Sequence, residues 1–250
     1  MESISIPFHP LIQPKIGILG GLSWHSTQLY YRYLNEEYAR QHGHHHSLPL
    51  VINSLNLQQV IEGFKNRPHL IKELIQECRI FTQTPCIPIL IASNTVHALY
   101  SDLQRAYPQL RWLHIAECLA LACKEKSICR LGLLGTRYTV SRSFYRRTLE
   151  QKGIEVIVLN RADQKQIDSI IEQELTQGQC TQLTQNKASY FTQKLHQNGA
   201  QAIALACTEL PLWITNAPIP LLNTALIHCQ SALQIYQAYI DSLRLEDTVT

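Results

Sequence analysis

The chain of 250 residues has no apolar run that approaches the roughly 20 residues a membrane-spanning helix needs. We expect no signal peptide at its start either, because the opening stretch MESISIPFHPLIQPK is too polar and too interrupted by proline. We therefore expect that stretch to be an irregular lead-in to the first strand. These two absences predict a protein that does not enter a membrane and that works in the cytoplasm.

A strong charge of one sign is missing as well. The 22 Lys and Arg and 19 Asp and Glu give a net charge of +3, spread along the chain without a basic block interleaved with aromatics. Nucleic acid is therefore not expected as a partner. A hydrophobic fraction of 45% is typical of a globular protein, and the length allows one domain or two of about 100–125 residues.

Metal-binding and dinucleotide motifs are absent too. None of the eight cysteines forms a CxxC pair, and no Cys/His group has the spacing of a zinc site. The run from His42 to His46 falls in a predicted loop without a nearby carboxylate, so we expect no metal there. Gly17, Gly20 and Gly21 do not have the GxGxxG spacing, and no acidic residue closes the second predicted strand. The sequence thus predicts neither a metal nor a dinucleotide.

What the sequence does contain is a regular alternation of strands and helices. Predicted strands cover 15–19, 48–55, 87–92, 111–115, 129–134, 154–159, 202–206 and 219–222. Predicted helices cover 24–41, 61–81, 96–106, 117–124, 164–177, 181–197 and 224–243, the second one interrupted near Pro68. Such alternation predicts parallel sheets covered by helices on both faces.

The two halves of the chain repeat the same pattern. KIGILGGLSWHST and CRLGLLGTRYT each read as strand, glycine, hydroxyl residue and helix, and IASNTVHAL and AIALACTEL each end an apolar strand in small polar residues. The repetition predicts an α/β fold of two pseudo-symmetric lobes, each a parallel sheet flanked by helices, with the active site between them. We expect 15–115 together with 223–250 to form the first lobe and 116–222 the second. Ser93 and Cys207 would then approach a ligand from opposite sides.

The ordered set GILGGLSWHSTQLYY, HHS, SNTVH, LGLLGTRYT, ACTEL and the closing IH resembles the aspartate/glutamate racemase family. The resemblance implies a cofactor-independent enzyme that inverts an amino acid at Cα between two lobes, and a homodimer. In that family two cysteines flank Cα, one removing its proton while the other protonates the opposite face. A thiol suits this task because its pKa of about 8.5 can be tuned by its neighbours.

The family's site residues carry over by position. Cys207 matches the second-lobe cysteine, and Ser93 stands where the first-lobe cysteine would be, as in a branch that carries a hydroxyl residue there. The resemblance implies that the following residues bind substrate: Gly21, Leu22, Ser23, Asn94, Thr95, Thr136, Thr208 and Glu209. Asn94 and Thr95 could instead cap the next helix.

Further positions match or depart from the family pattern. His97 and His228 match family histidines, and we interpret both as packing or hydrogen-bonding residues rather than bases. His25, Asn56 and Asn223 replace acidic residues of the pattern, which leaves the substrate open.

Three functions remain possible from the sequence. The first is racemisation of aspartate or glutamate, with Cys207 as the main acid/base and Ser93, directly or through a water, as the weaker partner. The second is decarboxylation of a malonate-type acid, in which one cysteine protonates the carbanion left by carbon dioxide. The third is a carboxylate-binding protein with little turnover. A serine hydrolase is not expected, because Ser93 has no base that we can pair with it.

Overall fold

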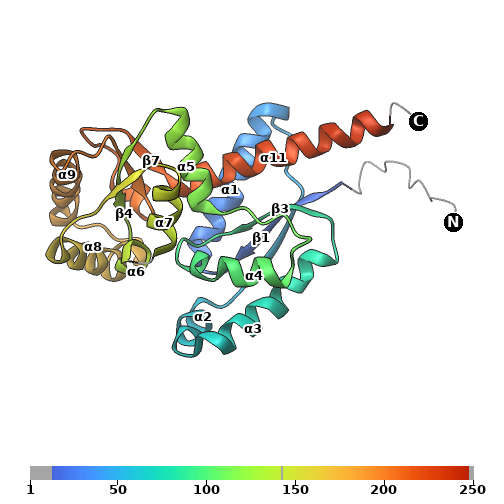
Figure 1. The fold of residues 1–250 in the computed structure, drawn as a ribbon, viewed down its shortest axis with the longest axis horizontal. Coiled ribbons are helices and arrows are strands. Elements are labelled where there is room, and N and C mark those ends of the chain that lie inside the picture. The colour runs from blue at the N-terminus through green and yellow to red at the C-terminus, as the bar shows by residue number, and fades with distance from the viewer. Residues whose placement is uncertain (1–12, 142, 248–250) are drawn as a thin grey trace.

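The computed structural model describes residues 13–141 and 143–247, so that most of the predicted lead-in lies outside the described residues. It confirms the predicted α/β fold, with two parallel sheets that are each flanked by helices (Figure 1). Within the described part of the chain, no helix is both long enough and apolar enough to cross a membrane.

The first sheet has the strand order β2-β1-β3. Its strands are β1 (Lys15–Gly20), β2 (Leu50–Ser54) and β3 (Cys86–Ile91). One face packs against α1 (Trp24–His42) and α11 (Thr224–Asp247), and the other against α3 (Arg67–Cys78) and α4 (Tyr100–Ala106), with α2 (Leu57–Gly63) beside α3. The central strand is covered on both faces, since the side chains of Ile16, Ile18 and Leu19 are fully buried. This double covering explains the apolar run in the sequence.

The second sheet has the strand order β5-β4-β6-β7. Its strands are β4 (Arg130–Leu134), β5 (Glu155–Ile157), β6 (Ala202–Leu205) and β7 (Leu221–Asn223). One face packs against α5 (Ile115–Glu125) and α7 (Ser143–Gln151), and the other against α8 (Arg161–Gln173) and α9 (Gln182–Gln197). Two short helices, α6 (Arg137–Ser141) and α10 (Leu210–Trp213), follow β4 and β6. In both sheets the first strand lies between the second and the third, as expected for pseudo-symmetric halves.

The predicted strand over 111–115 is wrong. Only Trp112 pairs with the first sheet, in a single bridge to Ile89. The chain then turns into α5, because the Nδ1 atom of His114 accepts a hydrogen bond from the Ala116 N–H at 3.1 Å and caps the helix. The cap ends the extended segment after one pairing.

Two predicted helices are broken rather than continuous. The segment 61–81 covers the end of α2, a 3₁₀ turn over Phe64–Asn66, α3 and most of a second 3₁₀ turn, Arg79–Thr82. Asn66 starts α3 as its N-cap, accepting from the His69 N–H at 3.4 Å, with proline in the first turn. The predicted helix over 96–106 begins as a 3₁₀ helix, Thr95–Leu99, before α4. In the first case a capping side chain within an amphipathic run divides it, whereas no side chain caps the start of α4.

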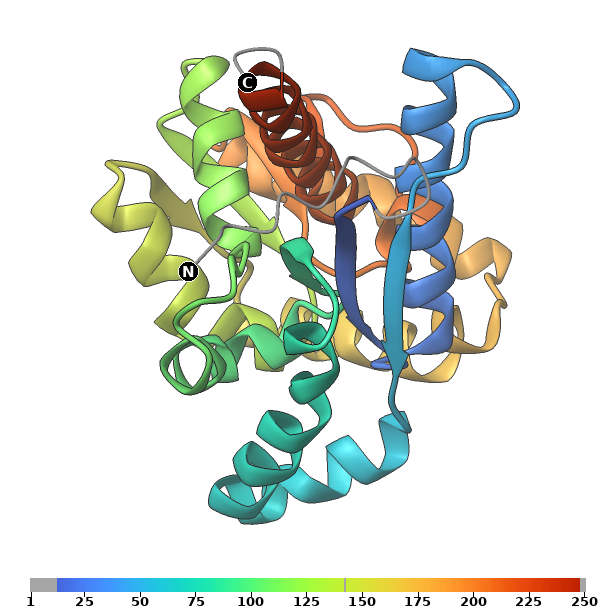
Figure 2. The same cartoon turned by 90° about the vertical axis from the view of Figure 1, so that its right-hand side faces the viewer.

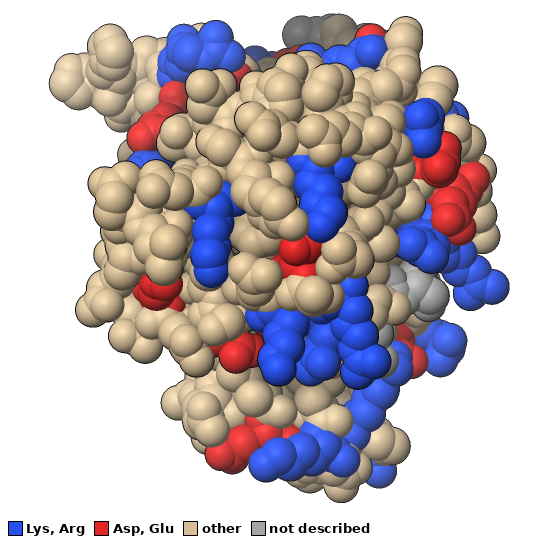
Figure 3. All heavy atoms as spheres, turned by 90° about the vertical axis from the view of Figure 1, so that its left-hand side faces the viewer, with Lys and Arg blue, Asp and Glu red and all other residues tan. Residues whose placement is uncertain are grey.

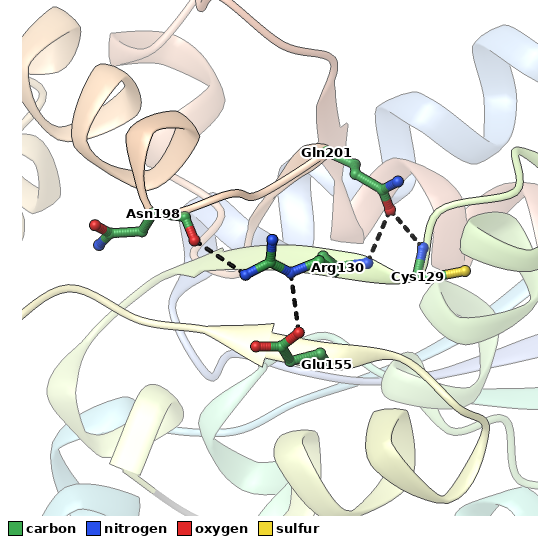
Figure 4. Close-up of polar contacts among 5 residues, drawn as sticks. All are labelled: Cys129, Arg130, Glu155, Asn198 and Gln201. Carbon is green, nitrogen blue, oxygen red and sulfur yellow. Dashed lines mark hydrogen bonds and ion pairs between the residues drawn. The ribbon is translucent and has the colours of Figure 1, made fainter.

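The amino end of β4 is anchored by Gln201 (Figure 4). The Oε1 atom of Gln201 accepts from the N–H groups of Cys129 and Arg130 at 2.7 and 2.9 Å. Arg130 donates from Nε to Glu155 on β5 at 2.9 Å and also to the Asn198 carbonyl at 3.2 Å. These contacts fix the second sheet at the amino ends of its strands. The polar turns that follow β4 and β6 lie at the other end, where the strands finish.

Helix α11 follows the last strand of the second sheet and returns along the first sheet. Figure 2 shows it between α5 and α1, and it contacts both helices as well as β3. The division into 15–115 with 223–250 and 116–222 stays a prediction, and its last three residues lie outside the described part of the chain.

Candidate active site

Strand ends of the two sheets meet at a cavity of about 90 Å³. Its lining comes from the turns that follow β1, β3, β4 and β6: Leu22, Ser23, Ser26, Ser93, Asn94, Thr95, Thr136, Thr139, Ala206, Cys207, Thr208 and Glu209. Every predicted site residue except Gly21 is therefore in the lining. The carboxyl ends of parallel strands are where open α/β sheets place their ligands.

The turn after β1 depends on Gly21, which has a φ of +70°. A Cβ added there would lie 2.0 Å from the Leu55 carbonyl oxygen, so that only glycine fits. The Gly21 N–H donates to the hydroxyl of Thr27 at 2.8 Å. Gly21 thus shapes the turn, while the next residues reach the cavity.

Ser23 caps α1 in a strained conformation, with a φ of 129°. Its hydroxyl accepts from the Ser26 N–H at 3.4 Å. The hydroxyl of Ser26 lies 2.7 Å from that of Thr208, which belongs to the turn after β6. Strain of this kind is often found at functional sites, and here it accompanies a hydrogen bond that joins the two sheets.

The turn after β3 presents Ser93, Asn94 and Thr95. The Ser93 hydroxyl accepts from the Val96 N–H at 3.4 Å and lines the cavity. The buried Tyr145 of α7 donates its hydroxyl proton to Oδ1 of Asn94. This contact fixes the amide, and its NH₂ group has no partner among the described residues, so it is available as a donor for a carboxylate.

The turn after β4 contributes a pair of threonine hydroxyls. Those of Thr136 and Thr139 lie 3.2 Å apart, and that of Thr139 lies 3.5 Å from the Thr95 hydroxyl across the cavity. Hydroxyl groups can donate to either oxygen of a carboxylate, so this row matches the expected substrate group.

Cys207 is the one thiol in the lining. It donates to the Oε2 atom of Glu209 at 2.9 Å, and the Thr208 hydroxyl donates to the same oxygen at 2.8 Å. Burial, reinforced by the Glu209 carboxylate, raises the pKa of the Cys207 thiol well above its usual value of 9.0. At neutral pH Cys207 is therefore a thiol that can donate a proton. The group that accepts its hydrogen bond is the Glu209 carboxylate.

Three buried histidines lie behind the Ser93 turn. His97 donates from Nδ1 to the Ser93 carbonyl at 2.7 Å and accepts at Nε2 from the Ile115 N–H at 3.2 Å. His228 lies between the Tyr30 hydroxyl at 2.9 Å and the Leu113 carbonyl at 3.0 Å. Neither lines the cavity, so both have the supporting role that we expected of them.

Stability should fall steeply in mild acid because these histidines are buried in their neutral form. Burial lowers the pKa of His114 to about 4 and that of His228 to about 3, and it lowers the pKa of His97 well below 6.5. Below pH 6.5 these histidines bind protons in the unfolded chain but stay neutral in the folded chain. Each histidine should then remove on the order of 1 kcal/mol per pH unit from the free energy of unfolding.

Urea unfolding at pH 7, 6 and 5 measures this loss. His228→Gln should flatten the slope with pH, whereas His69→Gln, at an exposed histidine on α3, should leave it unchanged. Equal slopes in the His228→Gln variant and the unmodified protein would contradict the assignment.

Sequence reasoning missed Ser26 and Thr139. Both follow a capping hydroxyl residue by three positions, Ser26 after Ser23 and Thr139 after Thr136, so that each begins the next helical turn on the same side. The repeated hydroxyl-x-x-hydroxyl spacing in the two related segments was the signal that could have identified them.

The positions that depart from the family's acidic residues lie outside the lining. His25 stacks on Trp24 with ring centroids 3.6 Å apart. Asn56 caps α2, and Asn223 accepts from the Leu226 N–H at 3.2 Å in the first turn of α11. Asparagine satisfies these helix ends as well as aspartate does.

The cavity is small because the two sheets are joined across it. Its volume of about 90 Å³ is well below the roughly 300–1,000 Å³ of most ligand pockets. Hydrogen bonds that connect the halves beside the cavity join Ser26 with Thr208, Thr95 with Thr139, and Asn94 with Tyr145. Entry of an amino acid therefore requires these contacts to loosen.

Known proteins share this architecture. The family described as Asp/Glu/Hydantoin racemase matches residues 19–232. A Yersinia pestis structure assigned as an Asp/Glu racemase is 30% identical, with a TM-score of 0.84 over 90% of this chain and 100% of its own. An aspartate racemase homologue from Pyrococcus horikoshii is 27% identical, with a TM-score of 0.78 and the same coverage. The aspartate racemase of Picrophilus torridus, 20% identical over 88% of this chain and 94% of its own, shares the fold with a TM-score of 0.68.

Proposed function

The chain belongs to the Asp/Glu/Hydantoin racemase family, and from that premise we propose that it racemises aspartate or glutamate without a cofactor. One observation carries the proposal. Ser93 at the end of a strand in the first sheet and Cys207 at the end of a strand in the second line the same cavity. Inversion at a carbon needs one proton-transfer group on each face, and these two residues supply them.

Cys207 is the stronger of the two groups. As a thiol it protonates the carbanion, and as a thiolate, after losing its proton to solvent, it removes the Cα proton of the other enantiomer. Ser93 acts on the opposite face, where its hydroxyl gives a proton to Cα and takes one from a water at the same time, and the hydroxide that remains is neutralised by the proton that Cys207 released on becoming a thiolate. The proton count balances, and no free alkoxide is needed.

Substrate carboxylates would be held by uncharged groups. The NH₂ group of Asn94 and the hydroxyls of Thr95 and Thr136 are donors that can hold a carboxylate, and the described lining contains no Lys or Arg. An acidic side chain would therefore bind without an ion pair. We expect weak substrate binding for that reason.

The homodimer implied by the resemblance stays a prediction.

The test follows exchange at Cα directly. The protein is incubated in heavy water with the L- and D-forms of aspartate and glutamate, and with alanine and serine as uncharged controls. NMR reads the deuterium at Cα, and chiral chromatography reads the inversion. We expect deuterium exchange at Cα with aspartate or glutamate. Measurable binding of both enantiomers of both amino acids without exchange would contradict the proposal. Faster exchange with serine than with either would identify an uncharged amino acid as the substrate.

One-cysteine decarboxylation is the second candidate. The raised pKa of Cys207 favours it, because a resting thiol is ready to protonate a carbanion that no base had to generate. Release of carbon dioxide from a substituted malonate, with no exchange in any amino acid, would identify this reaction instead.

A further inference from the structure

A second hollow lies between α6, α7 and the start of α8, and none of its lining residues belongs to the cavity of Cys207. Its volume is about 540 Å³, large enough for a small organic molecule. Three arginines line it, Arg137, Arg146 and Arg161, and the described lining contains no Asp or Glu. Figure 3 shows Lys and Arg side chains gathered on the face that carries α6 and α8. We call this hollow the arginine groove.

The arginines are only loosely engaged within the protein. Arg137 lies 3.8 Å from Asp168, and Arg146 lies 3.7 Å from Glu150, with arginine side chains that are 75% and 48% exposed. Arg161 forms no ion pair within the described part of the chain. Exposed pairs of this length hold their partners weakly, so the guanidinium groups can turn to a bound anion.

Gln164 supplies the observation that points to a ligand. Its side chain lines the groove and is 7% exposed, and its Nε2 atom donates to the Gly135 carbonyl at 2.8 Å. A carbonyl can only accept, so this contact fixes which end of the amide is the oxygen. That Oε1 is the one side-chain nitrogen or oxygen with almost no solvent-accessible surface and without a partner among the described residues. Buried acceptors are nearly always satisfied, so a donor is missing here.

The rest of the wall is apolar. Val140, Val158 and Leu159 line the groove beside the arginines. An inorganic anion gains no binding free energy from such a surface, because it has no apolar part. An organic ligand body that covers the surface gains free energy because apolar area is buried. The groove thus offers positive charge, an apolar wall and one unsatisfied acceptor.

We propose that the arginine groove binds a phosphate ester that carries at least two negative charges, an apolar body and one hydrogen-bond donor. The guanidinium groups hold the phosphate oxygens in the paired geometry that arginine favours. The body rests on Val140, Val158 and Leu159, and Gln164 turns its buried Oε1 toward the donor of the ligand when the ligand binds. Nothing in this inference depends on the proposed reaction at Cys207, because it is tested by binding.

The groove also lies next to the catalytic turn. Gln164 holds the Gly135 carbonyl, and Arg137 directly follows Thr136 and donates its backbone N–H to Asp168. A ligand that engages Gln164 and Arg137 therefore contacts both ends of the segment that presents Thr136 to the cavity. Occupancy of the groove would therefore change the position of the Thr136 hydroxyl in the cavity of Cys207.

Calorimetric titration of the full chain with ADP, pyrophosphate and adenosine tests the proposal. ADP has all three features, pyrophosphate has only the charge, and adenosine has only the body and the donor. ADP should bind more tightly than either fragment. Arg161→Ala should weaken ADP about tenfold or more, while Arg105→Ala, at an exposed arginine of α4 that pairs with Asp102 at 3.6 Å, should leave binding unchanged.

A second variant addresses the unsatisfied acceptor. Gln164→Met keeps the length of the side chain but removes the oxygen, so ADP binding should weaken while pyrophosphate binding stays the same. A melting curve checks that this variant is folded. Absence of ADP binding at millimolar concentration, or equal weakening by Arg105→Ala and Arg161→Ala, would overturn the proposal.

Discussion

Cys207→Ser is expected to reduce deuterium exchange at Cα by about a thousandfold or more, which is the range that general acid–base groups contribute. The serine hydroxyl keeps the shape of the side chain and its contact with Glu209, but it is a far weaker acid than a thiol. The substitution therefore removes proton transfer while it leaves the cavity intact. Exchange in heavy water measures the loss for each enantiomer separately.

The pH dependence should identify the role of the thiol. Because burial and Glu209 raise the pKa of Cys207, the thiolate fraction grows as the pH rises above neutrality. Exchange that uses Cys207 as the base should increase from pH 7 to 9. Exchange in the other direction, where the thiol is the acid, should not increase over that range.

Cys180→Ser provides the matched control. Cys180 is an exposed cysteine just before α9 and does not line the cavity, so exchange should be unchanged in this variant. Full exchange in Cys207→Ser would remove Cys207 from the mechanism. Equal losses in both variants would trace the effect to the general loss of a thiol rather than to this site.

The parts of the site that the sequence predicted are those governed by local rules. Strands that end in SNT and CTE had to bring their polar residues to the carboxyl edge of their sheets, and Ser93 and Cys207 do line one cavity. Gly21 was expected to bind substrate; it lies outside the described lining of the cavity, in a turn where only glycine lets the backbone pass Leu55. A sequence pattern does not distinguish a residue that shapes a turn from one that faces a ligand.

What could not be predicted depends on contacts between distant segments. Tyr145 orients Asn94 from 51 positions away, and Ser26 meets Thr208 from 182 positions away. The strand expected over 111–115 failed for a related reason, because the cap at His114 outweighed the β-propensity of RWLHI. Such competition is decided by tertiary structure, and propensity alone cannot settle it.

Ser93→Cys is expected to accelerate exchange about a hundredfold in the direction where Ser93 acts as the base, within the range that a matched acid–base group contributes. A thiol ionises far more readily than a serine hydroxyl, and the Ser93 hydroxyl has no activating base: its described contact is the Val96 N–H at 3.4 Å. His97 does not serve as that base, since its Nδ1 donates to the Ser93 carbonyl and its Nε2 is occupied by Ile115. The variant therefore places a second ionisable group opposite Cys207.

Two further substitutions separate chemistry from packing at this position. Ser93→Thr keeps the hydroxyl and should retain exchange, whereas Ser93→Ala removes it and should slow one direction more than the other. A one-sided loss is the expected signature, because Cys207 still serves its own face. If Ser93→Ala slows both enantiomers equally and Ser93→Cys gives no gain, then Ser93 only supports the turn, and the proton on that face must come from a water held by Asn94 or Thr95 instead.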